Sequence, residues 1–167
     1  MESNITLLMP LNNYKKKIIK LLANKLDMFY VDVEELLEFD IIDKDKAVLT
    51  AGQDYVNKLE NKLVKTVSEY NNTIITLPYS LLNKTTHFNR LKDNSIIIGV
   101  SFSQEDYFKL LKKEKTLTEN QIKLEKVVFN ERNELMKNMS ELFIECDTTI
   151  QRDVIRQILL AIDRYYN

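Results

Sequence analysis

The chain has 167 residues, of which 44% are hydrophobic, and its 24 lysines and arginines nearly balance 25 aspartates and glutamates. This length and apolar content allow a single core and exclude an intrinsically disordered chain. The small net charge of -1 argues against a general nucleic-acid binder, and no apolar run approaches the roughly 20 residues that cross a bilayer. We therefore expect one domain over residues 1–167 that binds neither nucleic acid nor membrane.

The cysteine content and the N-terminal segment predict where the protein resides. Cys146 is the single cysteine, so no intramolecular disulfide forms, as is usual in a reducing compartment. The segment Met1–Pro10 has neither the apolar core nor the small-residue cleavage site of a signal peptide. We expect a cytoplasmic protein.

The first half of the chain alternates short apolar segments with amphipathic ones. Ile18, Leu21 and Leu22 recur at helical spacing, and Pro10 ends the apolar run before them. The predicted strands are Ile5–Met9, Met28–Val31 and Thr73–Leu77, and the predicted helices are Tyr14–Lys25, Glu34–Phe39 and Asp43–Tyr70, the last with an apolar stripe at Val56, Leu59, Leu63, Val67 and Tyr70.

The second half continues this alternation. Ser103 is expected to cap a helix, with Asp106 three residues later in a capping-box arrangement. The predicted strands are Ser95–Phe102 and Leu142–Cys146, and the predicted helices cover Asn83–Leu91, the residues after Ser103, Thr118–Met139 and Ile150–Tyr165. Strands that alternate with helices favour an α/β fold, here three layers (α/β/α) with a five-stranded parallel sheet.

Glycine is the most unusual feature of the composition. The chain has two glycines, Gly52 and Gly99, whereas an average composition of about 7% would give roughly a dozen. The segment Ile5–Asp32 has the order strand, loop, lysine-rich helix and carboxylate, which is typical of a phosphate-binding loop. Its loop nevertheless contains no glycine that would let the backbone wrap around a phosphate.

The chain resembles the shikimate kinase family, because several motifs that match only in part follow one another in the same order as in that family. Tyr14–Ala23 falls on the family's G-K-S/T helix, and Asp32-Val33-Glu34 falls on its D-x-D motif. Gly52–Glu60 is similar to the family's G-E-x-x-F-R-x-x-E helix, and Glu131–Met136 is similar to its E-R-x-x-L-Y element. The resemblance implies a P-loop small-molecule kinase fold and a place in aromatic amino acid biosynthesis.

The departures from the family pattern concern the groups that handle ATP. Met9 and Tyr14 stand at the two P-loop glycine positions, and Lys16 stands at the hydroxyl position that holds Mg²⁺. Asn57 replaces a substrate-binding arginine, and the lid segment Lys112–Leu117 has no arginine. The resemblance therefore indicates a degenerate member, for which no cofactor is expected.

The matching residues define the candidate site. Lys15, Lys16 and Lys17 are candidates for binding phosphate at a helix N-terminus, where the helix dipole favours anions. The alternative is a solvated basic face in which Lys15 pairs with Asp32. By resemblance Asp32 is a vestigial catalytic base, and Glu34 and Arg132 are substrate-binding candidates; an acidic helix start and a surface salt bridge are the alternatives.

Other chemically active residues have weaker functional interpretations. His87 lies in a polar stretch with no carboxylate or cysteine cluster near it, and no metal-ligand spacing appears. Cys146 is expected to be a small buried hydrophobe. Five aromatic residues are expected near the carboxyl end of the sheet, filling the vacated nucleotide cleft or stacking a base: Tyr14, Phe29, Tyr30, Tyr55 and Tyr79.

Two functional hypotheses follow. The first is a shikimate kinase-like protein without ATP-dependent phosphotransfer, which binds a protein partner or a small anion in a regulatory or scaffolding role. The second is an active kinase that transfers the γ-phosphate of ATP to shikimate or a related hydroxy acid. The second hypothesis requires ATP and Mg²⁺, with Lys15 on the phosphates.

Overall fold

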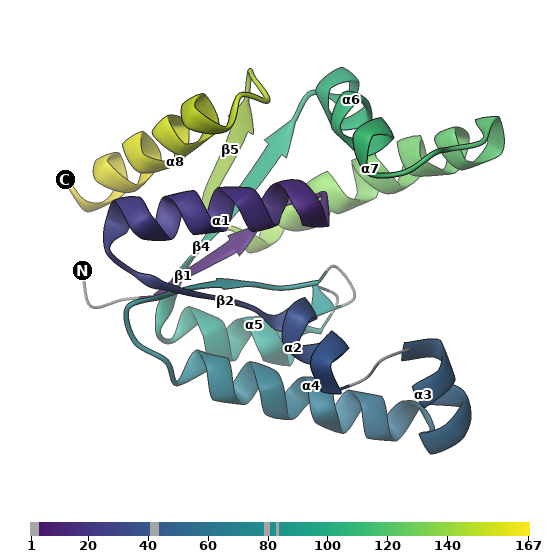
Figure 1. The fold of residues 1–167 in the computed structure, drawn as a ribbon. Helices are drawn as coiled ribbons and strands as arrows, with labels where there is room; N and C mark the ends of the chain where they lie inside the picture. The colour runs from purple at the N-terminus through teal and green to yellow at the C-terminus, as the bar shows by residue number, and fades with distance from the viewer. Residues whose placement is uncertain (1–3, 41–43, 79–80, 83) are drawn as a thin grey trace.

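The computed structural model describes residues 4–40, 44–78, 81–82 and 84–167, and a five-stranded sheet lies at its centre (Figure 1). The strand order is β2-β3-β1-β4-β5, and every pairing is parallel. The predicted α/β fold is confirmed, and each predicted strand ends within one residue of the observed one. The strands are β1 (Asn4–Leu8), β2 (Phe29–Asp32), β3 (Thr73–Thr76), β4 (Ser95–Phe102) and β5 (Leu142–Cys146).

The helices connect the strands as predicted, with differences in their bounds. The start predicted at Asn83 lies outside the described residues. The first helix begins at Asn12, two residues before the predicted Tyr14. The predicted helix from Asp43, a residue outside the described ones, is two helices separated at Gly52, whose φ of 85° favours glycine. The helices are α1 (Asn12–Leu26), α2 (Val33–Asp40), α3 (Lys44–Ala51), α4 (Gln53–Ser68), α5 (Thr85–Lys92), α6 (Gln104–Glu114), α7 (Glu119–Met139) and α8 (Gln151–Tyr166).

The apolar stripe predicted for α4 is partly wrong. Val56 and Val67 are buried, but Leu59 and Leu63 are only half-buried. Glu60 and Val64 are buried instead, at 1% and 0% exposure. Glu60 lies inside, where Lys84 pairs with its carboxylate, at a position that the predicted stripe does not include. Leu59 and Leu63 still pack against the core. Tyr70, the last member of the stripe, follows the helix and is 40% exposed.

The sheet is covered on both faces. Strands β1, β3 and β4 are buried along their whole length, as expected for central strands of a parallel sheet. One core packs α1, α6 and α8 against the sheet, and the other packs α2, α4 and α5. Figure 1 shows α1 and α8 on one side of the strands and α4 and α5 on the other. None of the described helices has the length and apolar content to cross a bilayer.

Two helix starts after the fourth strand have side-chain caps. The Ser103 hydroxyl accepts a bond from the Asp106 N–H at 3.1 Å, which confirms the predicted cap. The reciprocal half of the predicted capping box is replaced by an ion pair, because the Asp106 carboxylate lies 3.5 Å from Lys109. A complete capping box forms at the start of α7 between Thr118 and Gln121.

Replacing Gly99 with alanine should destabilise the centre of the sheet. A Cβ at Gly99 would meet the Ser140 hydroxyl and lie 2.9 Å from a ring carbon of Phe143, so β4 and β5 would have to shift. We expect a loss of about 1–3 kcal/mol in the free energy of unfolding, measured by urea denaturation. Ser140→Gly in the same background should restore part of the loss; a neutral Gly99→Ala variant would contradict this account.

Candidate functional site

The turn between β1 and α1 is tight and apolar. Leu11 has a φ of 73°, a left-handed conformation that is uncommon for a non-glycine residue. Its side chain is nevertheless 8% exposed, so burial of the leucine offsets the backbone strain. Because α1 begins at Asn12, the backbone between Leu11 and Tyr14 is helical and does not form a loop that wraps around a ligand.

Tyr14 fixes the first turn of α1 to two other parts of the molecule. Its hydroxyl donates to the carbonyl oxygen of Thr149 at 2.7 Å. Its ring packs edge-on against Phe102, with centroids 5.5 Å apart. Burial raises the pKa of the Tyr14 phenol to about 12, so the hydroxyl remains a donor at physiological pH. Tyr14 thus joins the end of β4 and the β5–α8 connection to the start of α1.

Glu114 supplies a negative charge to the start of α1. The Tyr14 N–H is in the first turn, where backbone donors have no partner within the helix, and it donates to Glu114 Oε1 at 3.1 Å. A carboxylate is favourable at this end of a helix because the helix dipole is positive there. The last residue of α6 therefore occupies a position where α/β proteins bind anions.

Lys15 is almost completely buried, and its ammonium donates to Asn12 Oδ1 at 3.4 Å. Its ammonium lies 3.9 Å from Asp32 Oδ1 and 3.7 Å from Glu34 Oε2, which confirms the predicted pairing with Asp32. The prediction that the lysines form a solvated face is wrong for Lys15, because it is 1% exposed. Asp32 Oδ1 also accepts a bond from the Glu34 N–H at 3.0 Å, which holds the carboxylate toward the lysine.

The remaining lysines do not converge on an anion. Lys16 pairs with Glu35 at 3.1 Å. Partial burial lowers the pKa of Lys16, but the hydrogen bond and charge of Glu35 outweigh burial and raise it overall. Lys17 and Lys20 are exposed on α1. The predicted phosphate-binding set of Lys15, Lys16 and Lys17 is therefore spread over different directions of the helix.

A pocket of about 500 Å³ opens at the carboxyl end of the sheet, where ligands of such folds bind. Glu34 and Arg132, predicted as substrate contacts, both line it. The Tyr107 hydroxyl donates to Glu125 at 3.0 Å, and Lys115 pairs with the other oxygen of Glu125 at 3.0 Å. The pocket is lined by Leu11, Asn12, Glu34, Pro78, Tyr107, Leu111, Glu114, Lys115, Glu125 and Arg132.

The ionised form of Glu125 is favoured within this pocket. Burial alone would raise the Glu125 pKa, but the hydrogen bonds from Lys115 and Tyr107 lower it overall. Burial, followed by the charge of Glu125, raises the Tyr107 pKa to about 12. Sequence reasoning missed Tyr107, Glu114 and Glu125, because contacts between α6, α7 and α1 leave no local pattern in the sequence.

The groups present do not fit MgATP at the start of α1. The Glu114 carboxylate accepts a hydrogen bond from the Tyr14 N–H at the start of α1, where its charge would repel a phosphate, and Lys16 pairs with Glu35. Among the described residues, no group of three histidine, cysteine, aspartate or glutamate side chains is arranged to hold a metal. Within the part of the chain that the structure describes, buried Asp32 Oδ2, Glu34 Oε2 and Thr76 Oγ1 have no hydrogen-bond partner.

The five aromatic residues predicted near the carboxyl end of the sheet differ in burial, and Tyr14 is 7% exposed. Phe29 and Tyr30 lie on edge strand β2 and are 73% and 43% exposed, and Tyr55 on α4 is 51% exposed. Phe29 is at the amino end of its strand, away from the carboxyl end of the sheet. Tyr79 lies outside the described residues. Among the four of these residues that the structure describes, Tyr14 alone is buried, beside Phe102 at the end of β4.

Cys146 and His87 are both buried. Burial, followed by the charge of Asp147, raises the Cys146 pKa to about 12, in agreement with an unreactive core thiol. His87 is 1% exposed although its sequence context is polar. Neither ring nitrogen of His87 has a hydrogen-bond partner among the residues that the structure describes.

The pH dependence of stability should change when His87 is replaced by leucine. Burial and, to a smaller extent, the charge of Lys84 lower the His87 pKa below 6.5, although the charge of Glu60 raises it. The unfolded state therefore takes up the proton first, and stability is lost as the pH falls through about 6.5. The His87→Leu variant should lose less stability between pH 7.5 and 5.5 in urea titrations. Asn89→Leu, at an exposed position of α5, is the control; parallel losses in wild type and variant would contradict the prediction.

The sheet order and the lysine–carboxylate pair after β1 and β2 define the P-loop kinase-like class of α/β folds. Solved shikimate kinases share this fold over nearly the whole chain. The enzyme from Bacteroides thetaiotaomicron superposes with a TM-score of 0.82 at 12% identity, covering 98% of this chain and 99% of that one. The Acinetobacter baumannii enzyme in complex with shikimate gives 0.79 at 17% identity, covering 98% and 94%.

Sequence comparison names the family within this class. The family model for shikimate kinase matches residues 15–163. A shikimate kinase of Sulfurihydrogenibium sp. is 24% identical over 164 residues, which cover 96% of this chain and 98% of the relative. That of Caldicellulosiruptor bescii is 27% identical over 162 residues, covering 95% and 91%. The chain belongs to the shikimate kinase family.

Proposed function

We propose that this protein is a shikimate kinase-like protein without ATP-dependent phosphotransfer, which acts by binding in a regulatory or scaffolding role. The observation that carries the proposal is the first turn of α1. The Glu114 carboxylate accepts the Tyr14 N–H at 3.1 Å, and the Tyr14 hydroxyl is bonded to Thr149. Groups of the chain itself take the place of a nucleotide phosphate.

Electrostatics support the proposal. Phosphoryl transfer depends mainly on positioning and on neutralising the charge of the phosphates. Here Glu114 adds a negative charge where an outer phosphate would need a positive one. The Lys15 ammonium is paired with the carboxylates of Asp32 and Glu34. Removal of one well-placed donor typically lowers a rate by about 10²- to 10³-fold, and here the loop glycines and the metal-binding hydroxyl are both replaced.

An active shikimate kinase is the second candidate, and one observation favours it. Glu34 and Arg132, the two substrate candidates, line the same pocket, and Lys15 and Asp32 lie beside it. In this alternative Asp32 would be the base, Glu34 and Arg132 would bind shikimate, and Glu114 would have to leave the start of α1.

A steady-state assay separates the two candidates. ADP release from MgATP and shikimate should stay below about 0.1 per second, whereas kinases typically turn over at about 1–100 per second. The Caldicellulosiruptor bescii shikimate kinase, assayed in parallel, is the positive control. Faster turnover by this protein would overturn the proposal.

Two variants identify the source of any residual activity. Arg132→Met removes a residue that lines the pocket, and Lys137→Met removes an exposed lysine in the last turn of α7 that does not line it. Activity that belongs to the protein falls in the first variant only. Activity from a contaminating kinase is the same in both.

Replacing Glu114 with glutamine should make anion binding at α1 easier. Glutamine can still accept a hydrogen bond from the Tyr14 N–H, but it brings no negative charge to the start of the helix. A charge at this position is worth about 0.3–1 kcal/mol, so pyrophosphate should bind the variant about two- to fivefold more tightly, as measured by isothermal titration. Glu119→Gln, at an exposed site on α7, is the matched control; equal affinities of wild type and Glu114→Gln would contradict the assigned role of Glu114.

A further inference from the structure

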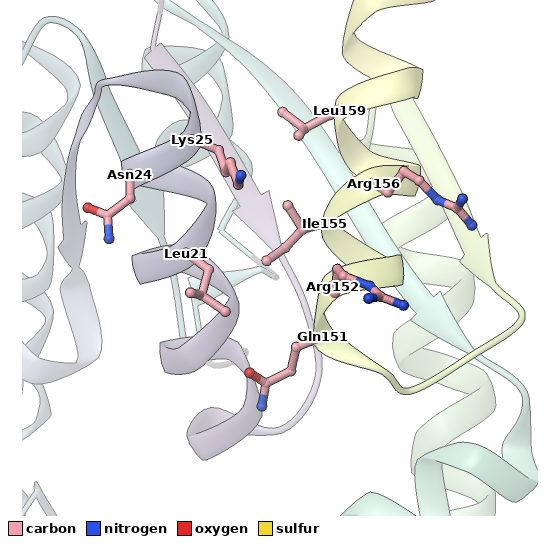
Figure 2. A pocket seen from close by; sticks show the side chains of 8 residues that line it. All are labelled: Leu21, Asn24, Lys25, Gln151, Arg152, Ile155, Arg156 and Leu159. Atoms are coloured by element: carbon pink, nitrogen blue, oxygen red, sulfur yellow. The ribbon is translucent and has the colours of Figure 1, made fainter.

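A second pocket, of about 710 Å³, lies between α1 and α8. Figure 2 shows Leu21, Ile155 and Leu159 on the facing sides of the two helices, with the Lys25 ammonium directed toward the space between them. Leu21 is 42% exposed. At about 1.5 Å per residue, Leu21 is roughly 14 Å along α1 from Asn12, so this groove is separate from the candidate site at the start of the helix.

The charged residues that line the groove are all cationic. They are Lys25, Arg152 and Arg156, and none of the acidic residues that the structure describes lines it, although the protein has a net charge of -1. The arginines extend from α8 on the side away from α1 (Figure 2). Both lie 3.8 Å from Asp153 Oδ1, beyond hydrogen-bond distance, and their side chains are 88% and 71% exposed. Their donors therefore remain accessible to an anionic partner.

The groove presents its side chains at the repeat of its own two helices. Leu21 and Lys25, Ile155 and Leu159, and Arg152 and Arg156 are three pairs at i, i+4. Residues at this spacing lie one turn apart, about 5–6 Å along the helix. An amphipathic helix presents its own apolar and charged side chains at the same repeat and binds by laying its apolar face into a groove.

We propose that the α1–α8 groove binds an acidic amphipathic helix of a partner protein. The apolar face of that helix packs on Leu21, Ile155 and Leu159, and its glutamates or aspartates, one turn apart, pair with Arg152 and Arg156. The proposal rests on the proposed function, because it gives the binding role a surface and a partner chemistry.

Fluorescence anisotropy on the full chain tests the proposal. The probe is a labelled 18-residue helical peptide with leucines at i, i+3 and i+4 and glutamates at i, i+4 along one flank. We expect the Arg152→Glu/Arg156→Glu variant to bind it more than about tenfold more weakly, because like charges then face each other. Leu21→Ser should also weaken binding, whereas Arg164→Glu, an exposed change in the last turn of α8, should not.

Four outcomes would overturn the proposal. The first two are that a peptide with lysine in place of glutamate binds equally well, and that the double arginine variant binds the peptide with unchanged affinity. The third is that dodecanoate binds more tightly than the peptide and displaces it. The fourth is that the chain dimerises and the arginine changes abolish the dimer. The last two would assign the groove to a small amphiphile or to a second copy. Peptide binding together with rapid ADP release would refute the proposed function alone. No peptide binding together with slow ADP release would refute the groove proposal alone.

Discussion

Replacing Lys15 with methionine is expected to lower the free energy of unfolding by about 3–5 kcal/mol. The ammonium is 1% exposed and lies within 4 Å of carboxylates of both Asp32 and Glu34. Its removal leaves the Asp32 carboxylate, also 1% exposed, without a countercharge. Urea denaturation at pH 7 measures the loss.

Two comparison variants show whether charge is the cause. Lys17→Met, on the exposed face of α1, removes the same group where no buried partner depends on it and should change stability by less than about 0.5 kcal/mol. Asp32→Asn combined with Lys15→Met should recover part of the loss, because it neutralises the orphaned carboxylate and keeps an acceptor for the Glu34 N–H. Additive losses in the double variant would show that the pair is not coupled.

Replacing Tyr14 with alanine should have an effect of similar size for a different reason. The ring is 7% exposed and packs on Phe102, so its removal leaves a cavity that costs about 3–5 kcal/mol. Tyr14→Phe keeps the ring and loses only the hydrogen bond to Thr149, which is worth about 1 kcal/mol. Thermal or urea denaturation distinguishes the two.

Tyr30→Ala is the control for Tyr14→Ala. Tyr30 is 43% exposed on edge strand β2, so its truncation should cost much less than that of Tyr14. If Tyr14→Phe were as destabilising as Tyr14→Ala, the hydroxyl rather than ring packing would hold the start of α1.

The fold could be predicted from the sequence because its signals are local. The runs at Ser95–Phe102 and Leu142–Cys146 are apolar and end at polar residues, and their observed bounds agree with the predicted ones. The hydrophobic spacing predicts Gly52 inside a helix, because a single glycine is tolerated within a helix. Its positive φ nevertheless separates α3 from α4. Boundaries that depend on backbone conformation cannot be read from hydrophobic spacing.

The candidate site was predictable only in part. The order of the motifs predicts three site residues, Lys15, Asp32 and Glu34, and the structure places them together. Glu114 could not be found in this way, because it meets Tyr14 across 100 residues and lies at the end of an otherwise ordinary helix. The polar neighbours of His87 likewise give no sign that its side chain is buried, although one side of α5 packs into the core.

The bond between the Tyr14 N–H and Glu114 makes one amide proton a reporter of motion. Donors in the first turn of a helix usually exchange quickly with solvent because nothing within the helix protects them. The Tyr14 amide is protected by a side chain of α6 instead. Its deuterium uptake, followed against that of the Lys15 amide, which is bonded to Leu11 within the same turn, therefore measures how often the end of α6 separates from α1.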